Sequence, residues 1–296
     1  MPRPLDSPLV SIVTPCLNAA RFIDETIQSV LGQDYPAIEY LVMDGGSRDG
    51  TLDILRRYQG QLEWRSEPDG GQADAVNRGF TLTRGEIFAF LNADDTYLRG
   101  AVSRVVEAFA RNPGAAVIYG DAWHMDEKGR RIARYPVEPF QPDGLERRCI
   151  ICQPAAFMRR QAFAECGGLN AGLRFALDYD LWIRMAPRGL VKIDAELAQA
   201  RLHPAAKTVG QTGAAIAETI GVLRRHYGYA PFNWIYGYAH HRLTGQPLAS
   251  ARPRMSMASA GSALALGLGY NWRHPIRFYR DVLASAKEGI AWAGQS

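Results

Sequence analysis

Short apolar runs alternate with helical patterns through the first 120 residues, and this alternation constrains the fold more than any other feature. Runs at residues 9–14, 38–44 and 87–91 have the length of strands, and segments 72–83 and 101–111 have the period of helices. The runs are continuously apolar, as in IFAFL, which is typical of strands that helices cover on both faces. The sequence therefore predicts an α/β fold with a mainly parallel sheet, followed by a helical C-terminal region.

Charge is distributed unevenly along the chain. The net charge is +4, but residues 1–198 carry 23 basic and 27 acidic side chains, whereas residues 199–296 carry 11 and 3. This split predicts that the last third faces either the phosphates of a ligand or an anionic membrane surface, with an ordinary solvated surface as the alternative. Nucleic-acid-binding proteins concentrate more Lys and Arg in one short run, so we expect no nucleic acid partner.

The chain has 296 residues, four cysteines and no apolar leader at its start. We therefore expect a cytoplasmic protein without structural disulfides. The uncharged stretch 255–272 has three Ser and three Gly among 18 residues, which is too polar for a membrane span. It is expected either to be buried against the main domain or to lie peripherally on the inner face of the membrane.

Three polar clusters directly follow predicted strands. Thr14 and Pro15 follow the first, residues 44–47 (Asp-Gly-Gly-Ser) the second, and residues 92–95 (Asn-Ala-Asp-Asp) a later one. In open α/β sheets, ligands bind outside the carboxyl ends of the strands. The three clusters are therefore expected to line one crevice.

Each cluster has a functional and a structural interpretation. Asp94 and Asp95 could bind a divalent cation, Mn²⁺ or Mg²⁺, or they could cap a helix. Asp44 could accept hydrogen bonds from a base or a ribose while Gly45 lets the backbone approach the ligand, or the two could form a simple glycine turn. The polar loop 67–74 runs into a predicted helix N-terminus, which is a natural anion site.

The second half adds two acidic residues and a histidine. Asp178 and Asp180 stand at i and i+2 and cannot share one helix face, so one is expected to cap the helix and the other to point to the crevice. His203 precedes a proline, and a lone histidine is more often structural than a metal ligand.

Together these motifs resemble the family-2 glycosyltransferases, which have the GT-A fold. The resemblance rests on SIVTPCLNAARFIDETIQSVLGQDYPAIEYLVMDGGSRDGT, EPDGGQADAVNRGF and GEIFAFLNADDTYLRGA, and resumes at ICQPAAFMRR, FALDYDLWIRMA and RLHPAAKT. It covers roughly two thirds of the chain. It implies a Rossmann-like catalytic domain over residues 1–228 and a helical extension over residues 229–296 that contacts an acceptor, a membrane or another subunit.

The resemblance implies an inverting transferase that moves a sugar from a UDP-, GDP- or dTDP-sugar to a glycan or lipid-linked acceptor, in cell-surface polysaccharide or glycolipid assembly. It implies Asp178 as the catalytic base, with Asp180 in reserve. It also implies a Mn²⁺ or Mg²⁺ ion bound by Asp94, Asp95 and His203. The implied donor-binding residues are Thr14, Pro15, Asp44, Gly45, Asp74, Asn77 and Asp94.

Three positions depart from the family pattern. Asn92 stands at the first acidic place of the usual Asp-x-Asp, Leu177 replaces a common Glu before the base, and Cys16 with Leu17 replaces an aromatic residue. These departures leave a second hypothesis, a nucleotide-sugar-binding protein without turnover. A sugar-nucleotide-forming transferase is disfavoured, because TPCLNAAR follows the first strand in place of a glycine-rich phosphate loop.

Overall fold

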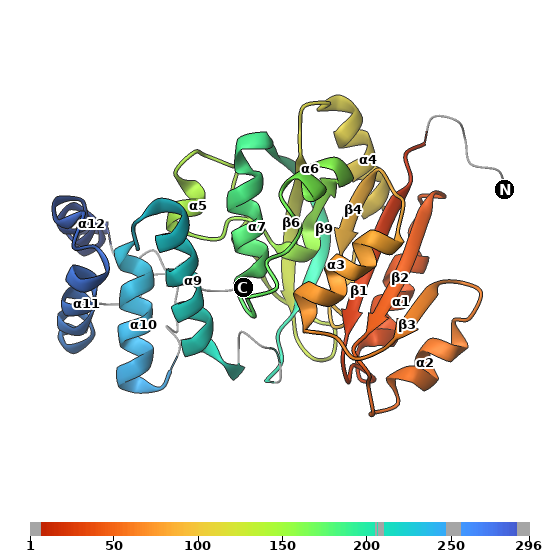
Figure 1. The fold of residues 1–296 in the computed structure, drawn as a ribbon, viewed down its shortest axis with the longest axis horizontal. Coiled ribbons are helices and arrows are strands. Elements are labelled where there is room, and N and C mark those ends of the chain that lie inside the picture. Colours follow the sequence, from red (N-terminus) through yellow and green to blue (C-terminus); the bar gives the residue numbers. More distant parts are fainter. Residues whose placement is uncertain (1–6, 205, 207–209, 247–255, 289–296) are drawn as a thin grey trace. The chain divides into compact units, whose positions relative to one another are not determined.

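The computed structural model describes residues 7–204, 206, 210–246 and 256–288. The chain divides into two compact units, Met1–Phe140 with Ile150–His203, and Gln141–Cys149 with Pro204–Ser296. The first unit contains the sheet and the second is helical (Figure 1). The sequence-based boundary after residue 228 was placed where the recognisable motifs end. The structural division depends on which residues contact one another in space, so the two differ. The extent of the functional domain stays a prediction.

A nine-stranded sheet forms the centre of the first unit, in the order β3-β2-β1-β4-β8-β6-β9-β5, with β7 paired to β6. β1, β2, β3 and β4 are mutually parallel, as the sequence predicted. β8 runs antiparallel between β4 and β6, and β9 is parallel to β6. β6 and β9 therefore point the same way as β4, and their carboxyl ends lie at the same edge of the sheet. The strands are β1 (Val10–Cys16), β2 (Ile38–Asp44), β3 (Glu63–Ser66), β4 (Ile87–Phe90), β5 (Thr96–Tyr97), β6 (Val117–Met125), β7 (Arg131–Arg134), β8 (Ala156–Arg159) and β9 (Leu190–Arg201).

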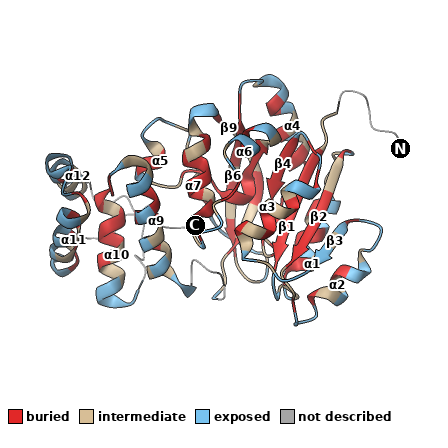
Figure 2. Cartoon of the chain, viewed as in Figure 1, coloured by how far each residue is buried: buried red, intermediate tan, exposed pale blue. Residues whose placement is uncertain are grey.

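Helices cover both faces of this sheet, which explains why β1 and β4 are buried along their whole length (Figure 2). On one face, α1 (Ile23–Leu31), α2 (Thr51–Arg57) and α4 (Ala101–Arg111) share a core with Ile12 and Val42. The continuous apolar runs of the sequence follow from this two-sided burial.

The opposite face is covered by α3 (Gln72–Leu82) and α6 (Arg160–Glu165). There the rings of Phe80, Phe88 and Phe163 form a cluster with centroids 4.6 to 5.0 Å apart. Phe88 reaches this face because side chains alternate along β4 and its neighbours point to the other core. The helix α7 (Leu177–Met185) completes the described α-helices of the first unit.

Two parts of the sheet were not expected from the sequence. β9 is twelve residues long, and no strand was predicted from the sequence in this segment. Its residues are mostly half-buried and mix charged with apolar types. The segment therefore shows neither a continuous apolar run nor a regular alternation of apolar and polar residues. β1 also continues beyond the predicted run 9–14 to Cys16, which places Pro15 within the strand.

The second unit consists of helices in its described part. They are α5 (Gly144–Arg147), α9 (Thr212–Tyr227), α10 (Phe232–Thr244), α11 (Met257–Tyr270) and α12 (Pro275–Glu288). α10 contacts α9, α11 and α12. Among the helices that the structure describes, none combines the length and apolarity needed to cross a membrane. Met255 of the uncharged stretch lies outside the described residues.

Candidate active site

Asp44 ends β2 and holds the loop that follows. Its side chain is buried and accepts hydrogen bonds from the backbone N–H groups of Gly46 (3.1 Å) and Ser47 (3.0 Å). The hydroxyls of Ser66 (2.6 Å) and Ser47 and the thiol of Cys16 (3.5 Å) also donate to it. Burial alone would raise the pKa of Asp44, but these hydrogen bonds hold it below its usual value. The acceptor capacity of this carboxylate is therefore used within the protein.

Thr14 and Pro15 point to opposite faces of β1. The side chain of Thr14 is fully buried, and its Oγ1 lies 3.0 Å from Oη of Tyr40. Pro15 is aligned with Met43 of β2. Because side chains alternate along strands, Pro15, Met43 and Gly45 belong to the face that α3 covers. Of the two predicted pocket residues on β1, Pro15 is thus the one on the side of Gly45.

Asp69 occupies the space beside Gly45. A Cβ at Gly45 would lie 2.8 Å from Oδ2 of Asp69, so a side chain there would collide with this carboxylate. Asp69 is half-buried, and its Oδ1 accepts from the N–H of Gly71 (2.8 Å). Among the described residues, its Oδ2 accepts no hydrogen bond. Asp69 was not singled out from the sequence, although it lies in the polar loop 67–74.

Asp74 and Asn77, two residues predicted to bind the nucleotide-sugar donor, form hydrogen bonds with neighbouring loops. Oδ2 of Asp74 accepts from the N–H of Gly70 (2.9 Å), at the start of α3. The amide of Asn77 donates to the carbonyl of Leu169 (2.8 Å) and accepts from the N–H of Leu169 (2.9 Å). Both side chains therefore shape the loops around the N-terminal half of α3.

Adjacent Asp94 and Asp95 have different environments in the turn between β4 and β5. Asp95 is buried, and its carboxylate accepts from the backbone N–H of Arg201 (2.9 Å) and from the amide of Asn92 (3.1 Å). Burial and the neighbouring charge of Asp94 raise the pKa of Asp95 well above its usual value. Asp94 is 30% exposed, and its Oδ2 lies 2.9 Å from Nε2 of His203. The structure thus brings Asp94 and His203 into contact and places Asp95 behind them.

The contact between Asp94 and His203 offers one oxygen and one nitrogen ligand to a cation. Within the described ranges there is no group of three or more His, Cys, Asp or Glu side chains able to hold a metal ion. Mg²⁺ and Mn²⁺ commonly take one or two protein ligands and complete their coordination with water and substrate phosphates. The pair therefore fits an ion that binds together with a diphosphate.

Arg201, which the sequence analysis did not single out, fixes this turn from the end of β9. Its side chain is completely buried. Nε donates to the carbonyl of Asp94 (2.8 Å), Nη1 to the carbonyl of Asp126 (3.1 Å) and Nη2 to Glu25 (2.6 Å). The guanidinium also lies 4.7 Å from the ring centroid of Phe22. The RLHPAAKT motif contained this arginine, but nothing in a single sequence marks an arginine as buried. Ala205 and residues 207–209 lie outside the described residues.

Asn92 is the centre of an amide network. Its Oδ1 accepts from Gln72 (2.6 Å), and its Nδ2 donates to Asp95 and to Gln153 (3.1 Å each). Gln153 in turn donates to the carbonyl of Phe90 (2.6 Å). A carboxylate at position 92 could not donate these hydrogen bonds and would add a charge beside Asp95. The departure from the usual acidic residue therefore has a local physical reason.

Asp178 lies in the first turn of α7 and is partly exposed. Its Oδ1 accepts from the N–H of Tyr179 (2.8 Å), and burial raises its pKa to about 6. Asp180, the reserve candidate, has a 2% exposed side chain and is ion-paired with Arg184 (2.8 Å). Asp178 is thus the more accessible proton acceptor of the two. In the described part of the chain it makes no hydrogen bond or ion pair with the other predicted site residues.

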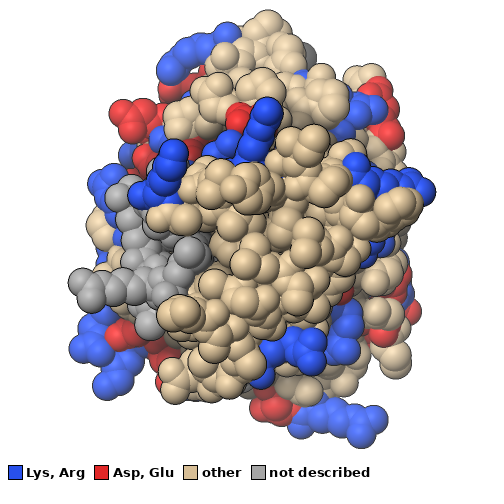
Figure 3. All heavy atoms as spheres, turned by 90° about the vertical axis from the view of Figure 1, so that its left-hand side faces the viewer, with Lys and Arg blue, Asp and Glu red and all other residues tan. Residues whose placement is uncertain are grey.

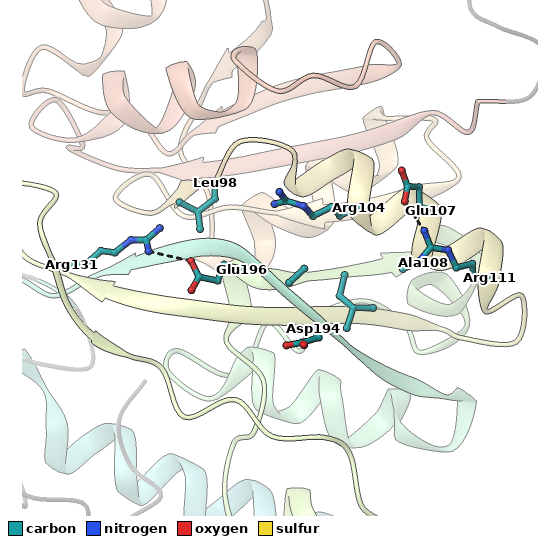
Figure 4. A pocket seen from close by; sticks show the side chains of 10 residues that line it. Leu98, Arg104, Glu107, Ala108, Arg111, Arg131, Asp194 and Glu196 are labelled. Atoms are coloured by element: carbon teal, nitrogen blue, oxygen red, sulfur yellow. Dashed lines mark hydrogen bonds and ion pairs between the residues drawn. The ribbon is translucent and has the colours of Figure 1, made fainter.

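A hollow of about 750 Å³ lies between α4, β7 and β9 (Figure 4). Its charged side chains largely compensate one another, since Arg131 bonds to Glu196 (3.1 Å) and Arg111 to Glu107 (2.7 Å). It contains none of the predicted site residues. We therefore do not assign the active site to this hollow. The candidate active site is the edge of the sheet at the carboxyl ends of the parallel strands, which carries Gly45, Asp69, Asp94 and His203.

Residues 11–178 match the profile described as Glycosyl transferase family 2, which covers more than half of the chain. The chain belongs to glycosyl transferase family 2. The matched segment contains Asp44, Asp94 and Asp95 and ends at Asp178. The family assignment made from the motifs is thereby confirmed.

One curated relative of this family-2 chain is the O-antigen biosynthesis protein RfbC of Myxococcus xanthus, which is 32% identical over 223 residues. The match covers 73% of this chain but only 17% of the relative. The family-2 chain therefore spans a small part of that protein.

Two solved structures share the fold of this family-2 chain. Staphylococcus aureus TarS 1–349 in complex with UDP-GlcNAc has a TM-score of 0.58 and 16% identity, over 95% of this chain and 92% of that one. The mannosyltransferase PcManGT from Pyrobaculum calidifontis, in complex with GDP-Man and Mn²⁺, has a TM-score of 0.57 and 19% identity, over 96% and 88%. The predicted α/β fold of the GT-A type, with C-terminal helices, is confirmed.

Proposed function

We propose that this chain transfers a sugar from a nucleotide-diphospho-sugar to an acceptor hydroxyl with inversion, in the assembly of a cell-surface polysaccharide or glycolipid. The observation that carries the proposal is the contact of Asp94 with His203 at the carboxyl edge of the sheet, in a chain of glycosyl transferase family 2. The nucleotide sugars in the two similar structures and the O-antigen role named for the relative support it. The acceptor in this proposal is a glycan or a lipid-linked sugar.

Asp94 and His203 would hold the Mn²⁺ or Mg²⁺ ion, which when bound offsets the negative charge on the leaving diphosphate. Arg201 positions Asp94 through the Asp94 carbonyl, and Asp95 anchors the turn from behind. Asp178 takes the proton of the acceptor hydroxyl as that oxygen bonds to the anomeric carbon. The bond from this carbon to the diphosphate oxygen breaks on the opposite face, so the configuration inverts.

We assign the contact with the donor base to Asp69 in place of Asp44. Asp44 uses its oxygens on five donors of its own loop and neighbouring strands, whereas Oδ2 of Asp69 accepts no hydrogen bond among the described residues. Gly45 lies against Asp69, and Pro15 belongs to the same face of the sheet, which α3 covers. Uracil, thymine and guanine each have a ring N–H that can donate a hydrogen bond to a carboxylate. The corresponding ring nitrogen of cytosine and adenine is itself an acceptor and cannot donate to it.

Incubation of the purified protein with UDP-, GDP- and dTDP-sugars and Mn²⁺ tests the transferase proposal. We expect one donor to release its nucleoside diphosphate, and we expect chelation of the metal to stop the release. His203→Ala should raise the Mn²⁺ concentration needed for half-maximal release, because it removes one of the two protein ligands. An inverted anomeric configuration of the product, measured by NMR, tests the stereochemistry. Donor binding without release or transfer would favour the hypothesis of a binding protein without turnover.

Asp69→Asn should remove the preference for diphosphates whose base carries a ring N–H. A hydrogen bond to a charged acceptor is worth about 1.5–3 kcal/mol, so the preferred diphosphate should bind about 10–100-fold more weakly. CDP should bind as before or more tightly, since an amide can donate to cytosine. Calorimetric titrations with UDP, GDP, dTDP, CDP and ADP measure this, with Glu67→Gln as a control in the same loop. An unchanged order of affinities would remove Asp69 from base recognition.

A further inference from the structure

The helix α11 exposes its large apolar side chains and buries its small residues. Ser259, Ala263 and Gly267 follow one another at intervals of four residues and are buried. A Cβ at Gly267 would lie 1.9 Å from the ring of Phe278 on α12, so the two helices are in close contact there. Surface helices ordinarily bury their larger apolar side chains and expose polar ones. α11 therefore has the reverse pattern.

The exposed apolar side chains continue from α11 through the connecting turn to α12. On α12 they recur at i, i+3 and i+7, which is one stripe of a helix. We define the outer face of α11 and α12 as Met257, Leu264, Leu268, Trp272, Ile276, Tyr279 and Leu283, with exposed fractions between 40% and 92%. Figure 3 shows this side of the helices as a broad area without charge, with Lys and Arg and some Asp and Glu around it.

Three cations next to this outer face have no acidic partner among the residues that the structure describes. Arg273, Arg280 and Lys287 are exposed and form no ion pair in the described part of the chain. Asp281 is the one acidic residue among the described side chains of α11 and α12, and it accepts from Tyr229 (2.9 Å) and from a backbone N–H (2.6 Å). The outer face is therefore apolar at its centre and positively charged at its border.

Arg277 differs from the other cations of α12. It is ion-paired with Glu146 of α5, and its guanidinium lies 4.2 Å from the ring centroid of Tyr229. These contacts hold α12 within the second unit. Arg277 therefore has a structural role, and its substitution would not isolate a contact with a ligand.

We propose that the outer face of α11 and α12 docks on the surface of an anionic lipid bilayer. The helices would lie in the plane of the interface, with the apolar side chains among the acyl chains and Arg273, Arg280 and Lys287 at the lipid phosphates. Tryptophan and tyrosine are enriched at membrane–water interfaces, and the outer face carries Trp272 and Tyr279. A second copy of the chain fits less well, because a symmetric pair would bring the same cations against each other.

Sedimentation of the full chain with vesicles tests this proposal without donor or acceptor, so the result is independent of the transferase proposal. We expect binding to vesicles of phosphatidylcholine with phosphatidylglycerol, and little binding to phosphatidylcholine alone. The double variant Arg273→Ala/Arg280→Ala should bind about 30-fold more weakly, since each cation adds roughly a fivefold factor at such a surface. Leu268→Glu/Ile276→Glu should also lose binding, because it places charge at the centre of the outer face.

Arg56→Ala/Arg57→Ala, on α2 of the first unit, removes the same number of positive charges and should bind like the wild-type chain. Melting curves of all variants show that they are folded. The proposal is overturned if the wild-type chain does not bind anionic vesicles, or if the outer-face variants bind as well as the control. It is also overturned if analytical ultracentrifugation shows a dimer that Leu268→Glu/Ile276→Glu dissociates, because a second copy would then cover this face.

Discussion

Asp178→Asn is expected to slow sugar transfer strongly while donor binding persists. The amide keeps the size of the carboxylate and can still accept from the N–H of Tyr179, but it cannot take a proton from the acceptor hydroxyl. Loss of general-base assistance lowers turnover by about 10²–10⁴-fold. Single-turnover transfer assays and donor titrations on the same preparation separate the two effects.

The pH dependence provides a second measurement of the same role. Because burial raises the pKa of Asp178 to about 6, the ionised form that accepts a proton is lost as pH falls through this value. About nine tenths of the side chain is ionised at pH 7 and about a tenth at pH 5, so transfer should fall correspondingly between them. In Asp178→Asn, the residual rate should lack this inflection.

Asp180→Asn is the matched control, because it makes the same chemical change two residues away. Asp180 is buried against Arg184, so its variant should lose stability and keep its turnover per folded molecule. If Asp180→Asn stops transfer and Asp178→Asn does not, the base is Asp180.

Arg201→Met is expected to have the largest effect on stability. The methionine has a similar length but leaves the carboxylate of Glu25 and the carbonyls of Asp94 and Asp126 without their donor. Glu25 is 53% exposed and stays solvated, so the cost comes from the two carbonyls that lose their donor, at about 1–3 kcal/mol each. Their sum corresponds to a fall in Tm of roughly 4–24 °C in a unit of this size. Mn²⁺-dependent turnover should also fall, because the carbonyl of Asp94 would no longer be held.

Arg131→Ala is the control for this variant. Arg131 is an exposed arginine that bonds to Glu196 (3.1 Å), and such surface pairs contribute about 0–1 kcal/mol. Its Tm should therefore stay close to that of the wild-type chain. Equal melting temperatures for Arg201→Met and Arg131→Ala would show that Arg201 does not hold the turn.

The N-terminal half of the fold could be predicted because its signals are local. Continuously apolar strands such as IFAF, and helices such as Gln72–Leu82, are visible within windows of a few residues. β9 was missed because its residues are only half-buried, and its pairing with β6 lies far away in the sequence. That strand carries Arg201 and leads to His203, so the part of the site that depends on it was also the least visible.

Asp94 and Asp95 show the same limit at the level of single residues. They are chemically identical neighbours, and the sequence assigned both to the metal. Burial of one against Arg201, and contact of the other with His203, distinguish them. The same holds for Asp44, whose hydrogen bonds come from Ser66, from Cys16 and from its own loop.

The sequence by itself determined the family, the parallel strands with their covering helices, and the group of acidic residues at one edge of the sheet. These features follow from patterns of apolar and polar residues within short stretches of the chain. The tertiary structure alone decided which carboxylates are used up by internal hydrogen bonds and which remain accessible, as Asp44 and Asp69 illustrate. The physical reason is that the burial and hydrogen-bond partners of a side chain are set by segments distant in the sequence, and these contacts determine its charge and its availability to a ligand.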